Sequence, residues 1–125
     1  MIKRDWRVIV VEDNYDDLQV ILTVFEYYGI EAHGVSSARE CGDLLRNLHP
    51  QAVVTDLAMP NADGWDILAL VREHDPKHDI AVAAMTSYHS DKLAEKVYQR
   101  GFDEYFPKPI DPHEFIVRLE AMVQK

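Results

Sequence analysis

The stretch AVVTD at residues 52–56 decides the fold of this chain, because it is a short apolar run that ends on an acidic residue. Such a run, rich in β-branched residues, predicts a buried strand. A second run, VIVV at residues 8–11, is followed by Glu12 and Asp13, and a third strand-like stretch precedes Lys108. If these strands are parallel neighbours in one sheet, their carboxyl ends bring three carboxylates and one ammonium into a single crevice.

The rest of the chain alternates between short β-branched runs and longer segments with a helical spacing of apolar residues. We predict strands at residues 6–11, 32–35, 52–55, 80–85 and 104–106. We predict a first helix at residues 15–28 and a second that begins at a capping-box serine, Ser37, and continues through residue 48. A third helix follows a turn at residues 60–64 and is closed by Pro76, and a fourth begins at Ser90 or Asp91 and is stopped by Gly101. A last helix has Asp111 as its cap and extends through Val123. Five strands that alternate with five helices predict an α/β fold with a doubly wound parallel sheet.

Composition and charge limit the possible functions. The length of 125 residues and the 47% of hydrophobic residues fit a single domain spanning residues 1–125. A formal charge of −9 repels phosphate backbones and anionic membranes, so we expect no direct nucleic-acid binding. The apolar runs are too short for a membrane span, and the first residues lack the apolar core of a signal peptide. A single cysteine, Cys41, agrees with a reducing compartment, and we expect a cytoplasmic location.

The acidic crevice predicts a metal site. Clustered carboxylates raise one another's proton affinity unless a cation neutralises them, so Glu12, Asp13 and Asp56 favour a hard divalent metal with oxygen ligands. Each residue also has a simpler structural interpretation. Glu12 and Asp13 could cap the following helix, Asp56 could form a turn, and Lys108 could be a solvated surface charge. The joint spacing favours a site, since independent caps and turns have no reason to keep one register.

At these positions the chain resembles the receiver domains of two-component response regulators. The resemblance rests on the pair Glu12-Asp13, the stretch DLAMP at residues 56–60 with Gly64 behind it, Thr86 after the fourth strand, and Tyr105 before Lys108-Pro109. It covers nearly the whole chain, and the ordered set of motifs is highly specific. It implies a flavodoxin-like sheet with strand order 2-1-3-4-5 and an active site at the carboxyl ends of strands one, three and five.

The resemblance makes Asp56 the acceptor of a phosphoryl group from a sensor histidine kinase or a histidine phosphotransfer protein. A carboxylate is a weak nucleophile toward a phosphoryl group because two anions repel, so the site must supply positive charge. Mg²⁺ (or Mn²⁺) meets this need. The expected ligands are the carboxylates of Asp13 and Asp56 and the backbone carbonyl of Ala58, with Glu12 acting mainly through bound water. Lys108 would pair with a phosphoryl oxygen.

Two further residues are expected to pass the signal to a downstream protein target or effector domain. Thr86 would donate a hydrogen bond to the phosphoryl group, and in receivers of this kind the aromatic at the Tyr105 position can then swing inward. This movement changes the surface of the fourth helix, fifth strand and fifth helix, which is also the family's usual homodimer surface. The family commonly has a cis peptide bond at the position of Lys108-Pro109.

Two positions that vary in the family tune the lifetime of the aspartyl phosphate. They are Ala58, two residues after Asp56, and Tyr88, two residues after Thr86. Neither side chain offers a carboxylate or an amide to orient an attacking water. We therefore predict slow self-dephosphorylation.

The leading prediction is a phosphorylation-controlled signalling switch that catalyses only its own phosphorylation and dephosphorylation, and not an enzyme with a separate substrate. One alternative is a magnesium-dependent hydrolase of the haloacid-dehalogenase type. That class places a second Asp two residues after the first, where this chain has Ala58. The other alternative is a phosphorylation-independent interaction module with a dead pocket. Such modules usually lack an acidic, acceptor or lysine residue, and none of these is missing here.

Overall fold

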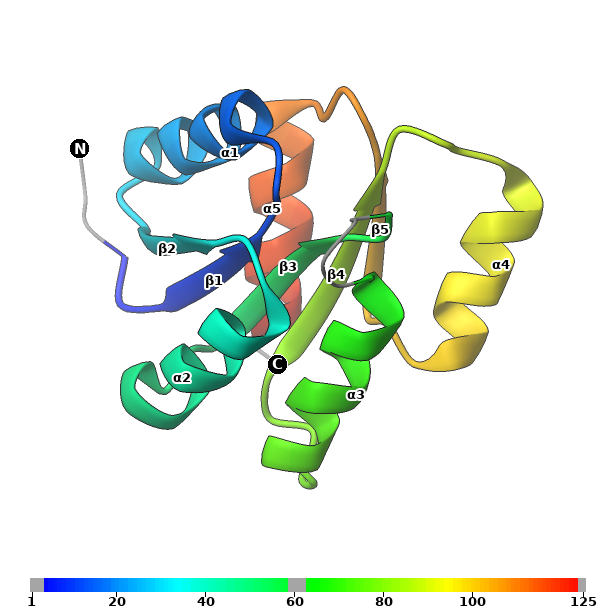
Figure 1. Cartoon of the computed structure of the whole chain (residues 1–125). Coiled ribbons are helices and arrows are strands. Elements are labelled where there is room, and N and C mark those ends of the chain that lie inside the picture. The colour runs from blue at the N-terminus through cyan, green and yellow to red at the C-terminus, as the bar shows by residue number, and fades with distance from the viewer. Residues whose placement is uncertain (1–3, 59–62, 124–125) are drawn as a thin grey trace.

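The computed structural model describes residues 4–58 and 63–123. Within these residues a five-stranded parallel sheet has the order β2-β1-β3-β4-β5 (Figure 1). The strands are β1 (Arg7–Val11), β2 (Glu31–Val35), β3 (Ala52–Asp56), β4 (Ala81–Thr86) and β5 (Glu104–Pro107). The predicted fold class and strand order are therefore confirmed. Each strand limit lies within one residue of the predicted one.

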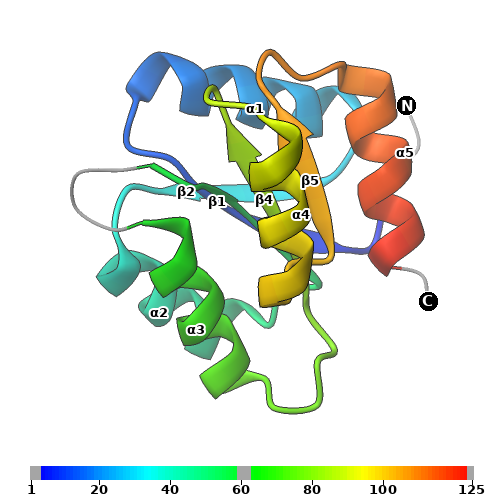
Figure 2. The same ribbon diagram turned by 90° about the vertical axis from the view of Figure 1, so that its right-hand side faces the viewer.

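Helices connect the consecutive strands and cover both faces of the sheet (Figures 1 and 2). One face carries α1 (Tyr15–Tyr27) and α5 (Pro112–Val123). The other face carries α2 (Ala38–Leu48), α3 (Gly64–His74) and α4 (Asp91–Arg100). The sheet therefore separates two apolar cores, as in other doubly wound folds.

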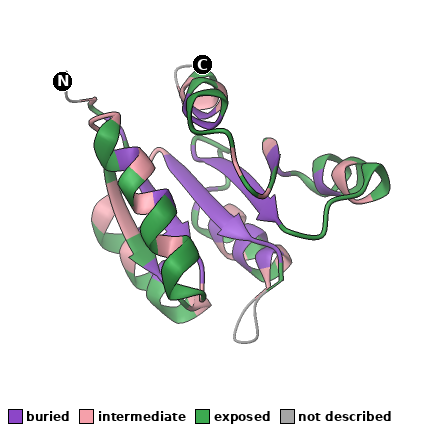
Figure 3. Cartoon of the chain, turned by 90° about the horizontal axis from the view of Figure 1, so that it is seen from above, coloured by how far each residue is buried: buried purple, intermediate pink, exposed green. Residues whose placement is uncertain are grey.

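The strand residues alternate between these two cores. Val8 and Val10 of β1 belong to the core under α1 and α5, whereas Ile9 and Val11 belong to the core under α2, α3 and α4. All four side chains are fully buried. Figure 3 shows the buried strands between helices whose outer surfaces are exposed. A strand covered on both faces has no polar side, which explains the continuous apolar runs in the sequence.

Side-chain caps fix where the helices begin. Asn14 caps α1, Ser37 caps α2, Asp63 caps α3 and Ser90 caps α4, each by accepting a hydrogen bond from a backbone N–H of the first turn. The expected helix start at Ser37 is thus confirmed. The reciprocal half of the capping box differs, because the Glu40 carboxylate accepts from the backbone N–H of Ser36 and not of Ser37.

The register of the sheet aligns the strand ends at one edge. Val11 of β1 is paired with Thr55 of β3, and Asp56 is paired with Met85 of β4. Thr86, the last residue of β4, is paired with Pro107 of β5. Consequently the residues that follow β1, β3, β4 and β5 emerge at the same edge.

The predicted turn at residues 60–64 lies outside the described residues at positions 60–62, and Asp63 and Gly64 begin α3. Across the described ranges, every helix is too short or too polar to traverse a bilayer. Cys41 of α2 is fully buried.

Candidate functional site

Lys108 lies at the centre of the crevice. Its ammonium Nζ donates to Glu12 Oε1 at 2.5 Å, to Asp56 Oδ2 at 2.8 Å and to Asp17 Oδ2 at 3.2 Å. These partners come from the end of β1, the end of β3 and the first turn of α1. The Lys108–Pro109 peptide bond is cis, as expected. One cation therefore joins three carboxylates at the carboxyl edge of the sheet.

Asp56 ends β3 with 9% of its surface exposed. Its Oδ1 accepts a hydrogen bond from the backbone N–H of Ala58 at 3.1 Å, and its Oδ2 accepts from Lys108. Both carboxylate oxygens are therefore fixed, so the side chain has a defined direction into the crevice.

Gly64 lies against the backbone that follows Asp56. The N–H of Gly64 donates to the carbonyl of Leu57 at 3.1 Å. A Cβ atom at position 64 would lie 2.9 Å from the carbonyl oxygen of Asp56 and 2.9 Å from the Cα of Leu57. These contacts are with backbone, which cannot yield easily, so the start of α3 requires a residue without a side chain.

Glu12 is almost fully buried and Asp13 is half-buried. Besides Lys108, the Glu12 carboxylate accepts the backbone N–H of Asn14 at 3.2 Å. The simpler interpretation of the acidic pair as a helix cap is wrong, because the cap of α1 is Asn14. Within residues 4–58 and 63–123 the Asp13 side chain has no hydrogen-bond or ion-pair partner, so its carboxylate is available to a cation.

The charges of the crevice perturb one another. Burial raises the pKa of the Glu12 carboxyl, and hydrogen bonds from Lys108 and from the N–H of Asn14 oppose that rise. Burial alone would lower the pKa of Lys108, but the hydrogen bonds and charges of Asp56 and Glu12 outweigh this effect and raise it above its usual value. The ammonium therefore stays protonated at neutral pH and acts as a fixed positive charge.

Thr86 and Tyr105 lie beside the crevice on β4 and β5. The Thr86 hydroxyl is buried and accepts the backbone N–H of Tyr88 at 3.0 Å. The backbone carbonyl of Thr86 accepts the N–H of Lys108 at 2.8 Å. Tyr105 is already buried in this structure, 4% exposed, and its hydroxyl lies 2.8 Å from Nδ1 of His89. The β4–α4 loop, which contains Tyr88 and His89, thus contacts both Thr86 and Tyr105.

The donor set fits a hard divalent cation, although the described ranges contain no preformed group of three or more metal-binding side chains. The Asp13 carboxylate lacks a partner among the described residues and directly follows buried Glu12. Carboxylate oxygens are the ligands that Mg²⁺ prefers. Ala58 is exposed beside Asp56 and has only its main-chain carbonyl to offer.

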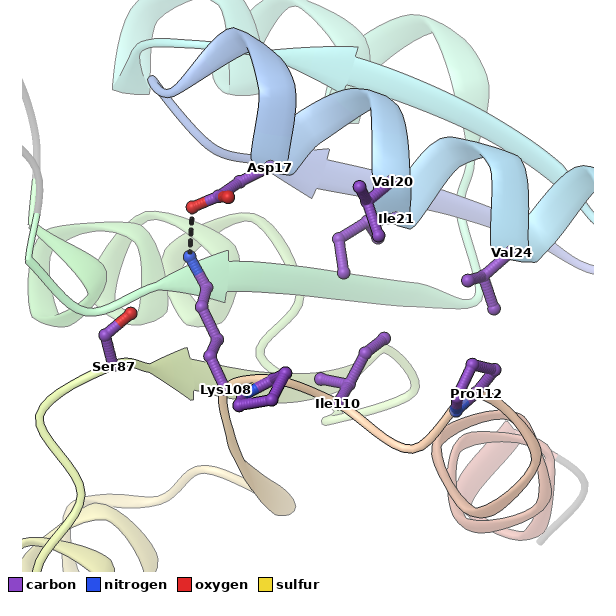
Figure 4. A pocket seen from close by; sticks show the side chains of 9 residues that line it. Asp17, Val20, Ile21, Val24, Ser87, Lys108, Ile110 and Pro112 are labelled. Atoms are coloured by element: carbon purple, nitrogen blue, oxygen red, sulfur yellow. Dashed lines mark hydrogen bonds and ion pairs between the residues drawn. The ribbon is translucent and has the colours of Figure 1, made fainter.

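An apolar groove of about 350 Å³ extends from the crevice between α1 and the segment that joins β5 to α5. Figure 4 shows Asp17 and Lys108 paired at one end of it, with Val20, Ile21 and Val24 of α1 facing Ile110 and Pro112. Sequence reasoning missed Asp17 and His89. Asp17 shares a face of α1 with Ile21 and Val24, which also line the groove, but this spacing alone does not indicate a contact with Lys108.

Together the fold and the site define an α/β domain that carries a lysine-bridged acidic crevice at the carboxyl edge of its parallel sheet. Residues 8–120 match the family model described as response regulator receiver domain. The chain belongs to that family.

Individual relatives agree with this assignment. The chain is 30% identical over 109 residues to an uncharacterized 14.6 kDa protein of Leptolyngbya boryana, covering 87% of this chain and 83% of that protein. It is 27% identical over 114 residues to the polar-differentiation response regulator DivK of Brucella ovis, covering 91% and 93% of the two chains. Among solved structures, the receiver domain of the Francisella response regulator 1452 has a TM-score of 0.85 and 25% identity, covering 96% and 98% of the two chains.

Proposed function

We propose that the chain is a single receiver domain whose Asp56 accepts a phosphoryl group, with Mg²⁺ bound, from a phosphohistidine of a sensor histidine kinase or phosphotransfer protein. The observation that supports this most is the position of Lys108, whose ammonium lies 2.8 Å from Asp56 Oδ2 and 2.5 Å from Glu12 Oε1. A cation held against the acceptor oxygen is what a transferred, doubly negative group requires. We propose that this switch acts in the cytoplasm.

The reaction needs positioning and charge. An oxygen of Asp56 forms a bond to phosphorus while the bond from phosphorus to the donor nitrogen breaks, and the imidazole leaves with the electron pair. When bound, Mg²⁺ (or Mn²⁺) neutralises the carboxylates and the incoming oxygens, with Asp13, Asp56 and the carbonyl of Ala58 as ligands and Glu12 acting through water. Lys108 exchanges a carboxylate partner for a phosphoryl oxygen.

Thr86 and Tyr105 are proposed to pass on the change. The Thr86 hydroxyl accepts a backbone N–H and keeps its own hydrogen free to donate to a phosphoryl oxygen. Such a bond would draw the β4–α4 loop inward. Because His89 of this loop contacts the hydroxyl of Tyr105, movement of the loop would alter how the buried Tyr105 side chain packs between β5 and the loop. The domain would then have two states that differ in the packing of the β4–α4 loop and Tyr105. The phosphoryl group shifts the population toward one of them.

The proposed output surface consists of α4, β5 and α5, with partners being a downstream protein target, an effector domain or a second copy of the chain. Tyr98 of α4 and Val117 of α5 are exposed there, 46% and 52% respectively. Arg118 pairs with Glu104 and Glu114, so its charge is largely satisfied within the chain. An apolar contact centred on Tyr98 and Val117 therefore fits a protein partner better than a new salt bridge through Arg118.

The test is transfer from acetyl phosphate to the wild type and to Asp56→Asn, each with Mg²⁺ and with EDTA. We expect an acid-stable, base-labile label on the wild type in the presence of Mg²⁺ and no label on the variant. Equal labelling of both proteins would contradict the assignment of Asp56. Labelling that is equally strong in EDTA would contradict the role of the metal.

A further inference from the structure

Asp17 is the third partner of Lys108, and nothing in the proposed chemistry requires it. A lysine ammonium has three hydrogens to donate, and the three carboxylates of Glu12, Asp17 and Asp56 accept all of them. A phosphoryl oxygen that binds Lys108 must therefore displace one of these bonds. Which bond is displaced depends on the cost of leaving each carboxylate without its cation.

The three bonds differ in length and exposure. The Glu12 side chain is 1% exposed and its bond is 2.5 Å long, whereas the Asp17 side chain is 49% exposed and its bond is 3.2 Å long. A buried carboxylate that loses its cation pays a large desolvation penalty, while an exposed carboxylate is hydrated by water at once. Asp56 stays next to Lys108 because it carries the new group. The Asp17 bond is therefore the one that can be released at least cost.

We propose that Asp17 is a positioning residue that holds Lys108 in the unphosphorylated state and releases it when the phosphoryl group arrives on Asp56. This inference rests on the proposed function. A bond that exists in one state and not in the other stabilises the first state by its own free energy. Asp17 also adds a negative charge next to Lys108, which opposes the approach of an anionic donor. Both effects slow the acceptance of a phosphoryl group by Asp56. They also weaken the binding of a phosphoryl mimic at this site.

The neighbouring residue Asp16 supplies a matched control. Asp16 and Asp17 are both exposed acids in the first turn of α1, so each interacts similarly with the helix dipole. Within the described ranges, the Asp16 side chain has no hydrogen bond or ion pair, and Asp17 contacts Lys108. Asp16→Asn therefore removes the same charge from the same turn without releasing the lysine.

The experiment compares the wild type with Asp17→Asn, Asp17→Glu, Asp16→Asn and Asp56→Asn. Acetyl phosphate and Mg²⁺ are added, and intact-protein mass spectrometry follows the adduct as the bond from Asp56 to phosphorus forms and acetate leaves with the electron pair. Calorimetry measures the affinity of each protein for Mg²⁺ and beryllium fluoride, a phosphoryl mimic. A role of Asp17 in folding alone would not strengthen that binding.

We expect Asp17→Asn to accept the phosphoryl group about two- to fivefold faster than the wild type, the range for a partly exposed ion pair, and to bind beryllium fluoride more tightly by a similar factor. Asp16→Asn and Asp17→Glu should resemble the wild type, since the first leaves the anchor in place and the second restores a carboxylate at the same position.

Several outcomes would overturn the proposal. One is an Asp17→Asn variant no faster than Asp16→Asn, and another is an Asp17→Glu variant as fast as Asp17→Asn. Unchanged or weaker binding of beryllium fluoride by Asp17→Asn would also overturn it. If the wild type is phosphorylated and any of these results is found, the inference about Asp17 is wrong but the proposed function stands. If the wild type takes up no more label than Asp56→Asn, the proposed function fails and the inference fails with it.

Discussion

At the scale of single residues, Lys108 holds the crevice together, because its ammonium pairs with carboxylates from distant parts of the chain. Lys108 is 96 residues from Glu12 and 52 residues from Asp56 in the sequence, yet it bonds to both. Removing one member of such a group would leave a buried charge without its partner, which costs far more than an exposed pair contributes. The buried members Glu12, Asp56 and Lys108 therefore depend on one another, whereas the half-exposed Asp17 does not.

We propose that Ala58 and Tyr88 set the lifetime of the phosphoryl group on Asp56. Both side chains are exposed, Tyr88 by 76%, so substitution there leaves the core intact. We expect the double variant Ala58→Asn, Tyr88→Glu to lose its phosphoryl group faster, by up to about 100-fold, the low end of what a positioned acid–base group contributes. The measurement is decay of the labelled protein after removal of the donor. Lys92→Glu, which adds an acid at an exposed position of α4, serves as the control. Unchanged or slower decay of the double variant would contradict the prediction.

The sequence predicted most of the crevice and missed its outer contacts. The convergence of Glu12, Asp56 and Lys108 could be predicted because each lies at the end of a strand or directly after it, and parallel strands end at one edge. The contact between Lys108 and Asp17 depends on the angle at which α1 crosses the sheet. That angle is set by packing of many side chains and has no signature in the local sequence.

At the scale of secondary structure elements, the junction between β3 and α3 sets the position of Asp56. Leu57 donates its N–H to the carbonyl of Met85, and its own carbonyl accepts the N–H of Gly64. These bonds tie the residue after Asp56 both to β4 and to the start of α3. The direction of the acceptor side chain thus depends on a close backbone contact that a sequence pattern does not reveal.

Substitution of Gly64 tests this dependence. Gly64→Ala places a Cβ 2.9 Å from the Asp56 carbonyl oxygen, and we expect it to lower the free energy of unfolding by about 1–3 kcal/mol, as overpacking does. Gly42→Ala in α2 is the matched control, because its Cβ meets side-chain atoms at 3.7 Å or more. In a helix interior this change should stabilise the chain by about 0.5–1 kcal/mol. Urea denaturation measures both, and a loss equal at the two sites would contradict the argument.

The ion pair between Glu104 of β5 and Arg118 of α5 predicts a dependence of stability on pH. Burial would raise the pKa of the Glu104 carboxyl, but hydrogen bonds from Arg118 and Tyr98 outweigh it and lower the pKa below its usual 4.5. The folded state then binds fewer protons than the unfolded state. The stabilisation is therefore fully present above pH 4.5 and is lost as the pH falls through the lowered value.

We expect Glu104→Gln to be less stable than the wild type by about 1–2 kcal/mol at neutral pH, which is at and below the low end for a hydrogen bond to a charged group because the Arg118 side chain is 32% exposed. The difference should shrink in acid. Chemical denaturation at a series of pH values measures it, with the exposed residue Glu73 changed to Gln as the control. A difference between wild type and Glu104→Gln that stays constant down to pH 3 would refute the assigned sign.

At the scale of the whole molecule, one arrangement explains both the fold and the chemistry. Helices on both faces bury β3 and β4 throughout and β1 beyond its first residue, whereas the edge strand β2 stays partly exposed. The fold was predictable because continuous apolar runs and helical periods alternate along the chain, and the right-handed crossover rule leaves few topologies. The whole chain carries a formal charge of −9, which favours the binding of a cation at the crevice. The same charge disfavours the approach of an anionic phosphoryl donor until that cation binds.

The most direct test of the central claim is to locate the phosphoryl group on the chain. The protein is treated with acetyl phosphate and Mg²⁺, reduced with borohydride, which converts an aspartyl phosphate to homoserine, and mapped by peptide mass spectrometry. We predict homoserine at position 56 and unmodified aspartate at positions 13 and 17. Homoserine at another position, or none at position 56 under conditions that fully label the protein, would contradict the claim that Asp56 is the acceptor.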